Sequence, residues 1–133
     1  MSHTLTFHDV RKANFKRCQK WHPGFPADDS WSGADWSNAL CGEAGELANV
    51  VKKLRRIETG HDPNPLKPEQ DEAWLKQALA DECADVFLYL DLLATKYGVD
   101  LPAAIIAKFN AVSERQGFPD RLDGRNIEPT EGV

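Results

Sequence analysis

The amino-acid sequence predicts an all-α protein, a four-helix-type bundle, and three observations support that fold class. Apolar residues recur at helical spacing in four segments. Stretches rich in proline or glycine separate these segments, and no run alternates apolar and polar residues as a half-buried strand does. With 133 residues, of which 41% are hydrophobic and 28% charged, the chain is long enough for one domain with a sizeable core. We expect residues 1–122 to form that domain and residues 123–133 to be a polar tail.

The first helix is expected from Thr4 to Trp21. Its apolar face carries Phe7, Val10 and Cys18 at helical spacing. Asn14 interrupts the middle of this face, either as a hydrogen-bonding residue inside the core or as the mark of a partly exposed helix. The stretch HPGFPADDSW then ends the helix, because its prolines and its glycine continue a helix poorly.

The second helix is expected to begin after Ser32, its N-cap, and to run to about Glu58. Asp35 lies three residues after Ser32, as in a capping box, and Gly60 is positioned to end the helix. The segment GHDPNPLKP, with three prolines in nine residues, is then a loop.

The third helix is expected to begin near Pro68 or Glu69 and to continue to Tyr97. A fourth helix, over residues 101–116, is predicted to follow its cap at Asp100. It has a proline in its first turn, where a missing N–H is tolerated.

One stretch of the third helix, VFLYLDLLA, is apolar nearly all round and is interrupted only by Asp91. A helix of this kind is normally buried on every side. In a chain this short, such a stretch predicts a subunit interface, and we therefore expect a homo-oligomer.

Charge and cysteine content narrow the possible partners. The formal net charge of −5 argues against a nucleic-acid partner, because phosphate backbones are bound by basic surfaces. The three cysteines, Cys18, Cys41 and Cys83, lack CxxC or metal-knuckle spacing, and we interpret them as buried reduced thiols. Since no signal peptide and no run of about 18 apolar residues is found, we expect a cytoplasmic protein with no membrane partner.

Acidic residues lie on the apolar faces of the second and third helices. At about 100° per residue, Glu43 and Glu46 share a face with Trp36. The apolar face of the third helix repeats the pair, as Glu82 and Asp85, with the same spacing of three residues. The sequence therefore predicts four carboxylates that face the interior of the bundle.

Buried carboxylates need a compensating charge. Desolvation of an unpaired carboxylate is unfavourable, and several close together repel one another unless a cation holds them. An all-oxygen site suits Mg²⁺ or Mn²⁺, so we expect a divalent metal site. A single ExxE pair is commonly a solvated surface feature, which is the alternative interpretation. A ferritin-like di-iron site ranks lower, because it requires Glu-x-x-His pairs and neither pair has histidine at the third step.

These motifs also resemble a known family. Glu43-x2-Glu46, followed by Glu82-x2-Asp85, resembles the ExxE…ExxD signature of the MazG-like all-α nucleoside triphosphate pyrophosphohydrolases. The flanking segments DWSNALCGEAGELANVVKKLRRI and ALADECADVFLYLDLLATKYGVDL are similar to that family as well. The similarity covers about residues 15–122. It implies an enzyme of nucleotide-pool house-cleaning that hydrolyses a (d)NTP to the (d)NMP and pyrophosphate with Mg²⁺, as a homodimer or homotetramer.

By position, the resemblance implies that the four acids are metal ligands. Glu46, and after it Glu43, are our candidates for the carboxylate that orients or deprotonates the attacking water.

Positive residues are expected to reach the phosphates of a nucleotide. Lys53 lies on the same face of the second helix as the acids. Lys108 and Arg115 are seven residues apart and nearly aligned on the fourth helix, although both could be solvated surface charges. Asn110 is a further possible site residue. It follows Lys108 by two residues, which departs from the basic and asparagine-containing pattern of the family.

Aromatic residues are the candidates for a base pocket. Trp36 lies on the same face as the acids and is expected either to stack a base or to pack in the core. Trp31 or His22 could close the pocket from the first loop, and Asn38 could read a base edge. Tyr89 either hydrogen-bonds a ligand or packs.

A second class of function stays open. The same bundle could be a non-catalytic nucleotide-binding or protein-interaction module. The presence of all four acids favours the enzyme, because a binding module has less need of them.

Overall fold

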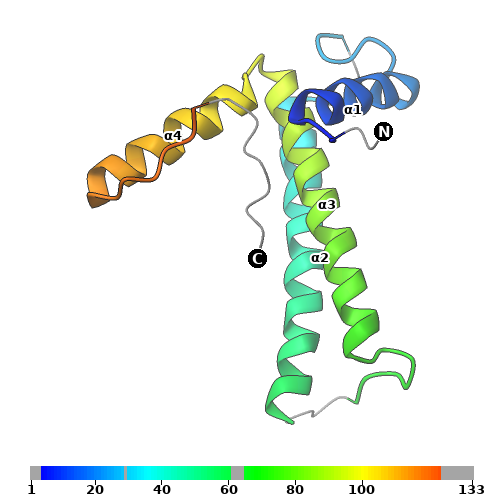
Figure 1. Ribbon diagram of the computed structural model, residues 1–133. Coiled ribbons are helices and arrows are strands. Elements are labelled where there is room, and N and C mark those ends of the chain that lie inside the picture. The colour runs from blue at the N-terminus through cyan, green and yellow to red at the C-terminus, as the bar shows by residue number, and fades with distance from the viewer. Residues whose placement is uncertain (1–3, 29, 61–64, 124–133) are drawn as a thin grey trace. The chain divides into compact units, whose positions relative to one another are not determined.

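The computed structural model describes residues 4–28, 30–60 and 65–123, and this part of the chain contains four helices and no strand. The all-α class is therefore confirmed. The helices are α1 (Phe7–Trp21), α2 (Gly33–Thr59), α3 (Glu72–Lys96) and α4 (Leu101–Gln116) (Figure 1). The chain divides into two compact units, residues 1–97 with α1, α2 and α3, and residues 98–133 with α4.

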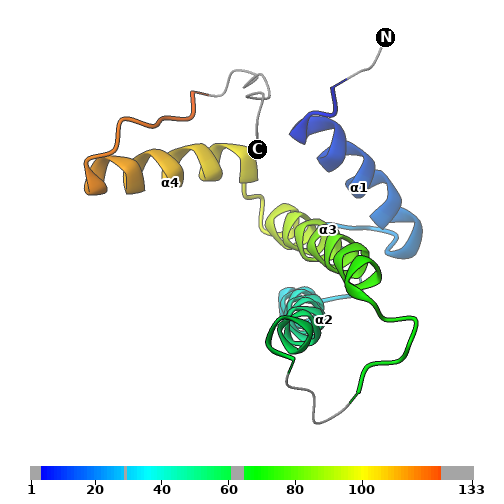
Figure 2. The same ribbon diagram turned by 60° about the horizontal axis from the view of Figure 1, so that its bottom comes forward.

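The first unit is built on a long antiparallel pair, α2 and α3, which lie side by side in both ribbon views (Figures 1 and 2). Helix α1 packs against α3 at the end of the pair where α2 begins and α3 ends. A helical pair joined by a loop buries only one face of each helix. Helix α1 covers a further face of α3, and it does so only at that one end of the pair.

Local sequence signals set most helix boundaries. The Ser32 hydroxyl accepts a hydrogen bond from the Asp35 backbone N–H, and the Asp35 carboxylate accepts one in return from the Ser32 backbone N–H, which completes the predicted capping box. Gly60 ends α2 in the left-handed conformation, with φ 62°. The predicted boundaries of the fourth helix, with Asp100 as its N-cap, are confirmed as well.

Two predicted helix starts were too early. Helix α1 begins at Phe7 rather than Thr4, because Thr6 forms a capping box with Asp9. Helix α3 begins at Glu72 rather than near residue 68, because Asp71 accepts a hydrogen bond from the Trp74 backbone N–H at 2.8 Å. In both cases the side chain of the capping residue accepts a hydrogen bond from a backbone N–H of the first turn, and the helix begins only after that residue.

The core of the first unit is aromatic and lies at the α1 end of the pair. Its buried members come from α1, the following loop, α2 and α3: Cys18, Phe25, Trp36 and Leu92. The expectation that all three cysteines are buried was wrong, because Cys41 and Cys83 are exposed. The Phe25 ring lies 5.4 Å from that of Trp36 and 5.8 Å from that of Phe15. The loop after α1 is thus folded back onto the helices and forms part of the core.

A buried polar network ties α1 to α3. Asp91 is 1% exposed, and its Oδ1 accepts a hydrogen bond from Arg11 Nε at 2.7 Å. Asn14 is 3% exposed and donates from Nδ2 to Asp91 Oδ2 and to the Leu88 carbonyl, each at 3.0 Å. Asn14 is therefore the hydrogen-bonding core residue of the two alternatives. Asp91, which interrupts an apolar stretch of the sequence, has its partners within the chain.

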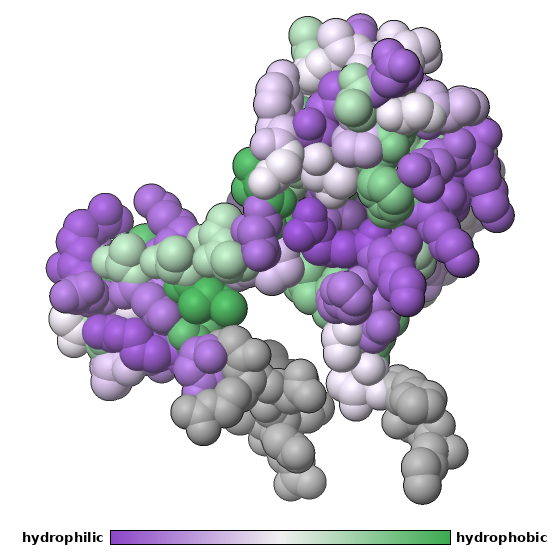
Figure 3. Space-filling view, turned by 90° about the horizontal axis from the view of Figure 1, so that it is seen from above, coloured by the Kyte–Doolittle hydropathy of each residue, from purple (hydrophilic) through white to green (hydrophobic). Residues whose placement is uncertain are grey.

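The second unit is α4 with the segment that follows it. Gly117 ends α4 at φ 73°, and the Asn110 side chain then bonds both the N–H and the carbonyl of Leu122 at 2.7 Å. Apolar residues are exposed on this unit among hydrophilic ones (Figure 3), including Phe109 and Phe118. The predicted tail, residues 123–133, lies outside the described residues from position 124 onward.

None of the described helices is long and apolar enough to cross a membrane.

Candidate functional site

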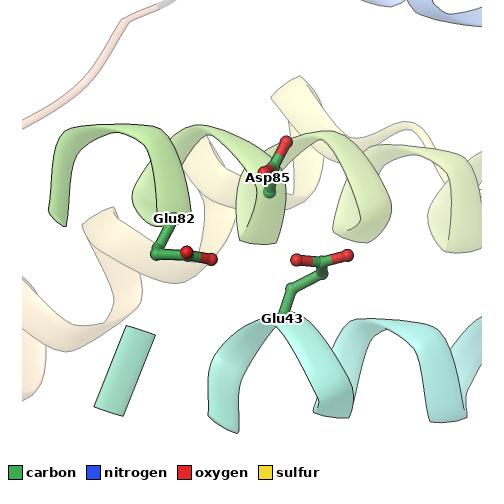
Figure 4. Close-up of side chains that lie close together, drawn as sticks. All are labelled: Glu43, Glu82 and Asp85. Carbon is green, nitrogen blue, oxygen red and sulfur yellow. The ribbon is translucent and has the colours of Figure 1, made fainter. Parts of the chain in front are cut away.

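Three of the four acids come together. Glu43 from α2 and Glu82 and Asp85 from α3 each offer a carboxylate oxygen, and these atoms all lie within 4.8 Å of one another. Glu43 and Glu82 point toward each other across the gap between the helices (Figure 4). The spacing of three residues on α3 places Glu82 and Asp85 on the same side of that helix, so a single short stretch of α2 can face both.

The described residues do not compensate the negative charge of this cluster. No described residue donates a hydrogen bond or an ion pair to the three carboxylates, and Glu82 Oε2 is inaccessible to solvent without a partner. Desolvation raises the pKa of Glu43, and the negative charges of Asp85, Glu46 and Glu82 raise it further. Desolvation also raises the pKa of Glu82, with smaller contributions from Glu46, Asp85 and Asp81. Unpaired acids with raised pKa values are typical of functional sites.

The donor set fits a hard divalent cation. Oxygen atoms from three carboxylates are the ligands that Mg²⁺ and Mn²⁺ prefer. Asp85 is exposed and the other two acids are half-buried, so the cluster borders solvent instead of lying in a closed core. A cation held there by Glu43, Glu82 and Asp85 would keep positions for water or a ligand.

Glu46 is the one of the four predicted acids that is not part of this cluster. It is exposed, one turn after Glu43 on α2. Its charge nevertheless reaches Glu43 and Glu82, whose pKa values it raises. The structure therefore brings three of the four predicted acids within 4.8 Å of one another, and Glu46 acts on them through its charge.

A cavity of about 290 Å³ adjoins the acidic cluster. Its walls combine two of the acids with aromatic side chains of α1, the first loop, α2 and α3: Glu43, Asp85, His22, Trp31, Trp36 and Tyr89. A concave pocket with aromatic walls and a few convergent polar groups is the usual form of a small-molecule site.

The aromatic wall is closely packed. The His22 ring lies 4.8 Å from that of Trp31 and 4.9 Å from that of Trp36, and the Trp36 ring lies 6.3 Å from Tyr89. Trp36 is only 2% exposed, so it belongs both to the core and to the lining of the cavity. The Nδ1 atom of His22 is buried without a hydrogen-bond partner, and the Tyr89 hydroxyl has its pKa raised by desolvation and then by Glu43 and Asp85.

Backbone geometry holds the aromatic loop in place. Gly24 has φ +90°, and a Cβ at this position would overlap the Asp28 carbonyl oxygen, so only glycine fits this turn without strain. Lys96 Nζ donates to the Trp31 carbonyl at 2.9 Å, which fixes the end of the loop to α3. Trp31 and His22 are thus positioned by contacts between residues far apart in the sequence.

Five residues that line the cavity were not predicted as site residues: Asn14, Arg17, Trp21, Leu88 and Leu92. Asn14 and Arg17 line it from α1, next to Trp21. The signal for Asn14 was visible as a polar residue within an apolar stripe. Arg17 follows Asn14 by three residues and lies on the same side of the helix. This spacing could have identified Arg17 as a candidate.

The remaining predicted residues lie elsewhere. Asn38 and Lys53, on α2, are not among the residues that line the cavity. Lys108 and Arg115 are exposed on α4, in the second unit. Asn110 uses both of its amide groups on the backbone of Leu122, which gives it a structural role in that unit. A part of any of these residues in a site stays a prediction.

Comparison with known proteins identifies relatives of one kind. The chain is 32% identical over 121 residues to dCTP pyrophosphatase 1 of Rattus norvegicus, and 31% identical over the same length to the Homo sapiens protein. Each match covers 88% of this chain and 61% of the relative, so the chain spans about three-fifths of the length of these relatives. No family model matches the chain.

A match over 88% of the chain includes the two acidic pairs of α2 and α3, whose spacing resembles the family signature. The fold, the position of the acids and the relatives agree with one another. The chain is thus similar to proteins of the MazG-like family of all-α nucleoside triphosphate pyrophosphohydrolases, to which these relatives belong.

Proposed function

We propose that this protein is a Mg²⁺-dependent hydrolase that converts a (d)NTP and water to the (d)NMP and pyrophosphate. The observation that carries the proposal is the juxtaposition of an uncompensated acidic cluster with an aromatic cavity. The cluster suits the metal that accompanies a triphosphate, and the aromatic wall suits a base. The names of the relatives make dCTP the first substrate to test.

Different residues would bind the metal, accept the proton and bind the nucleoside. Glu43, Glu82 and Asp85 would hold the cation, which when bound supplies positive charge to the phosphate oxygens. Glu46 is exposed and outside the cluster, so its carboxylate is available to take a proton from the water that attacks the α-phosphorus. The bond from the α-phosphorus to the bridging oxygen breaks, and pyrophosphate leaves with that oxygen. His22, Trp31 and Tyr89 would bind the nucleoside.

The biological role follows from the chemistry. Removal of a non-standard or surplus (d)NTP from the cytoplasmic nucleotide pool fits an enzyme that returns the monophosphate. Lys53, Lys108 and Arg115 remain candidates for phosphate contacts in this proposal.

The proposal includes a homodimer or homotetramer. Large apolar side chains of α2 and α3 are exposed, among them Val51 at 46%, Trp74 at 45% and Leu90 at 38%. Association of subunits would remove this surface from water. Light scattering at micromolar concentration tests this part, and a monomeric mass would contradict it.

Pyrophosphate release from a panel of canonical and modified NTPs and dNTPs tests the proposed reaction. We expect release from one or a few nucleotides with Mg²⁺ and none with EDTA. If a folded, nucleotide-binding protein releases no pyrophosphate from any of them, the non-catalytic binding module replaces the enzyme.

A further inference from the structure

Arg17 is the one permanently charged cation among the described residues that line the cavity. It is exposed at the cavity wall, and its guanidinium lies 5.4 Å from the centre of the Trp21 ring. No carboxylate of the described residues forms an ion pair with it. The cavity therefore contains a positive group that has no negative partner among the residues that the structure describes.

The position of Arg17 is supported from the core. Asn14 donates its two amide hydrogens to the Leu88 carbonyl and to Asp91. These bonds fix the orientation of the amide, so that Asn14 Oδ1 faces Arg17 and accepts a hydrogen bond from its Nη2 at 3.4 Å. Asn14 is thus a positioning residue for Arg17.

The cavity holds both signs of charge without pairing them. Tyr89 is within electrostatic reach of both, because Glu43 and Asp85 raise the pKa of its hydroxyl and Arg17 lowers it. A ligand that satisfies both ends must bring a cation to the acids and an anion to Arg17. A metal-bound nucleoside triphosphate meets this requirement, whereas a nucleoside does not.

We propose that Arg17 binds the phosphate chain of the substrate beyond its α-phosphorus, the part that leaves as pyrophosphate. This inference rests on the proposed function. In that proposal the α-phosphorus lies beside the acidic cluster, and the aromatic residues of the cavity bind the nucleoside. The two remaining phosphates carry most of the negative charge of the substrate, and the Arg17 guanidinium can neutralise part of it. The planar guanidinium suits bidentate contact with phosphate oxygens.

The test is calorimetric binding of two probes to the full chain with Mg²⁺, the α,β-imido analogue of dCTP and dCMP. For Arg17→Gln we expect an affinity for the analogue about 10- to 100-fold weaker, the range of one lost charge-assisted contact. The affinity for dCMP should change less than about twofold. Arg17→Lys keeps the charge but loses the planar fork, so it should fall between wild type and Arg17→Gln.

Lys20→Gln is the matched control, because it removes one positive charge from the same helix at a residue that does not line the cavity. It should bind both probes as wild type does. An unchanged affinity of Arg17→Gln for the analogue would overturn the inference, and so would an equal loss for dCMP, which would move Arg17 to the α-phosphate or the base. If the wild-type protein binds neither probe and releases no pyrophosphate from any nucleotide of the panel, the proposed function fails together with this inference.

Discussion

Helix α3 carries acids of two kinds, which differ in whether the described residues pair with them. Asp91 is fully buried and is paired with Arg11 and Asn14. Glu82 and Asp85 are less buried, and no described residue pairs with them. The buried acid thus has its counter-charge within the chain, while the acids beside the cavity face one another and Glu43.

The difference distinguishes an acid that stabilises the fold from the acids of the candidate site. An acid that stabilises the fold must be compensated by the protein, because an uncompensated buried charge is strongly unfavourable. An acid that binds a cation must lack such a partner, so the folded protein without the cation carries the repulsion. Burial alone therefore does not identify the site. The presence or absence of a partner does.

The largest expected effect is on turnover, from Glu82→Gln. This substitution keeps the shape of the side chain and removes one negative charge from the cluster. We expect kcat/KM for pyrophosphate release to fall about 100- to 1,000-fold, as for the loss of a preorganised electrostatic contact. The measurement is initial rate with Mg²⁺ on the best substrate of the panel.

Glu72→Gln is the matched control for Glu82→Gln. Glu72 is on the same helix, and its side chain is 59% exposed in a salt bridge with Lys76. Its replacement should leave turnover unchanged. Equal rates for Glu82→Gln and wild type would show that the cluster has no part in the reaction.

The next effect is on stability, from Asp91→Ala. Removal of this carboxylate takes away the negative charge that pairs with the Arg11 guanidinium, which also donates to the Thr95 hydroxyl, and leaves a cavity in the core. Because Arg11 is 22% exposed and can reach water, we expect a loss of about 2–3 kcal/mol in the free energy of unfolding, below the full cost of breaking a buried pair. Urea denaturation with wild type alongside measures this.

Glu58→Ala is the comparison for Asp91→Ala, since it also removes an acid that pairs with an arginine. The Arg55–Glu58 pair is exposed, at 70% and 63%, and should contribute less than about 1 kcal/mol. If the two substitutions cost the same, Asp91 is not the anchor of α1 that the structure indicates.

The smallest expected effect is on the pH dependence of stability without metal. The folded-state pKa values of Glu43 and Glu82 are raised above the ordinary 4.5. Between the ordinary and the raised value the folded state binds more protons than the unfolded state, so stability falls as pH rises through that window. In EDTA, the Tm of wild type should therefore fall more steeply above about pH 4.5 than that of Glu82→Gln. Added Mg²⁺ should raise the Tm of wild type at neutral pH and that of the variant less.

Asp9→Asn gives the opposite sign in the same scan. The Thr6 side chain and backbone lower the pKa of Asp9 below 3.8, so this acid stabilises the folded state above that pH and less below it. The difference between wild type and Asp9→Asn should therefore shrink as the pH falls through 3.8.

Parallel pH profiles for wild type and Glu82→Gln would mean that the cluster is not under electrostatic repulsion.

The sequence was sufficient for the helices because their ends are local. The Ser32–Asp35 capping box, Gly60 and the Asp100 cap act within one turn of the helix they bound. The starts of α1 and α3 were placed too early because the polar residues around them do not reveal which side chain captures the free N–H groups. Thr6 and Asp71 decide this in the structure.

The site could be predicted only in part. The spacing of three residues in each acidic pair fixed which acids share a helix face. It did not show that Glu43 joins Glu82 and Asp85 while Glu46 lies outside their cluster, because the rotation of α2 against α3 depends on packing along the whole pair.

What the sequence by itself determined is the set of elements with a period or a local signal, namely four helices, the caps at Ser32, Gly60 and Asp100, and the two acidic pairs. The tertiary structure alone decided that the loop with His22 and Trp31 folds back beside the acids, and that Arg17 lines the same cavity. It also decided which acid is compensated, since Asn14 and Asp91 meet across 77 residues of chain. Contacts of this range depend on how whole helices pack, and no local pattern of residues encodes them.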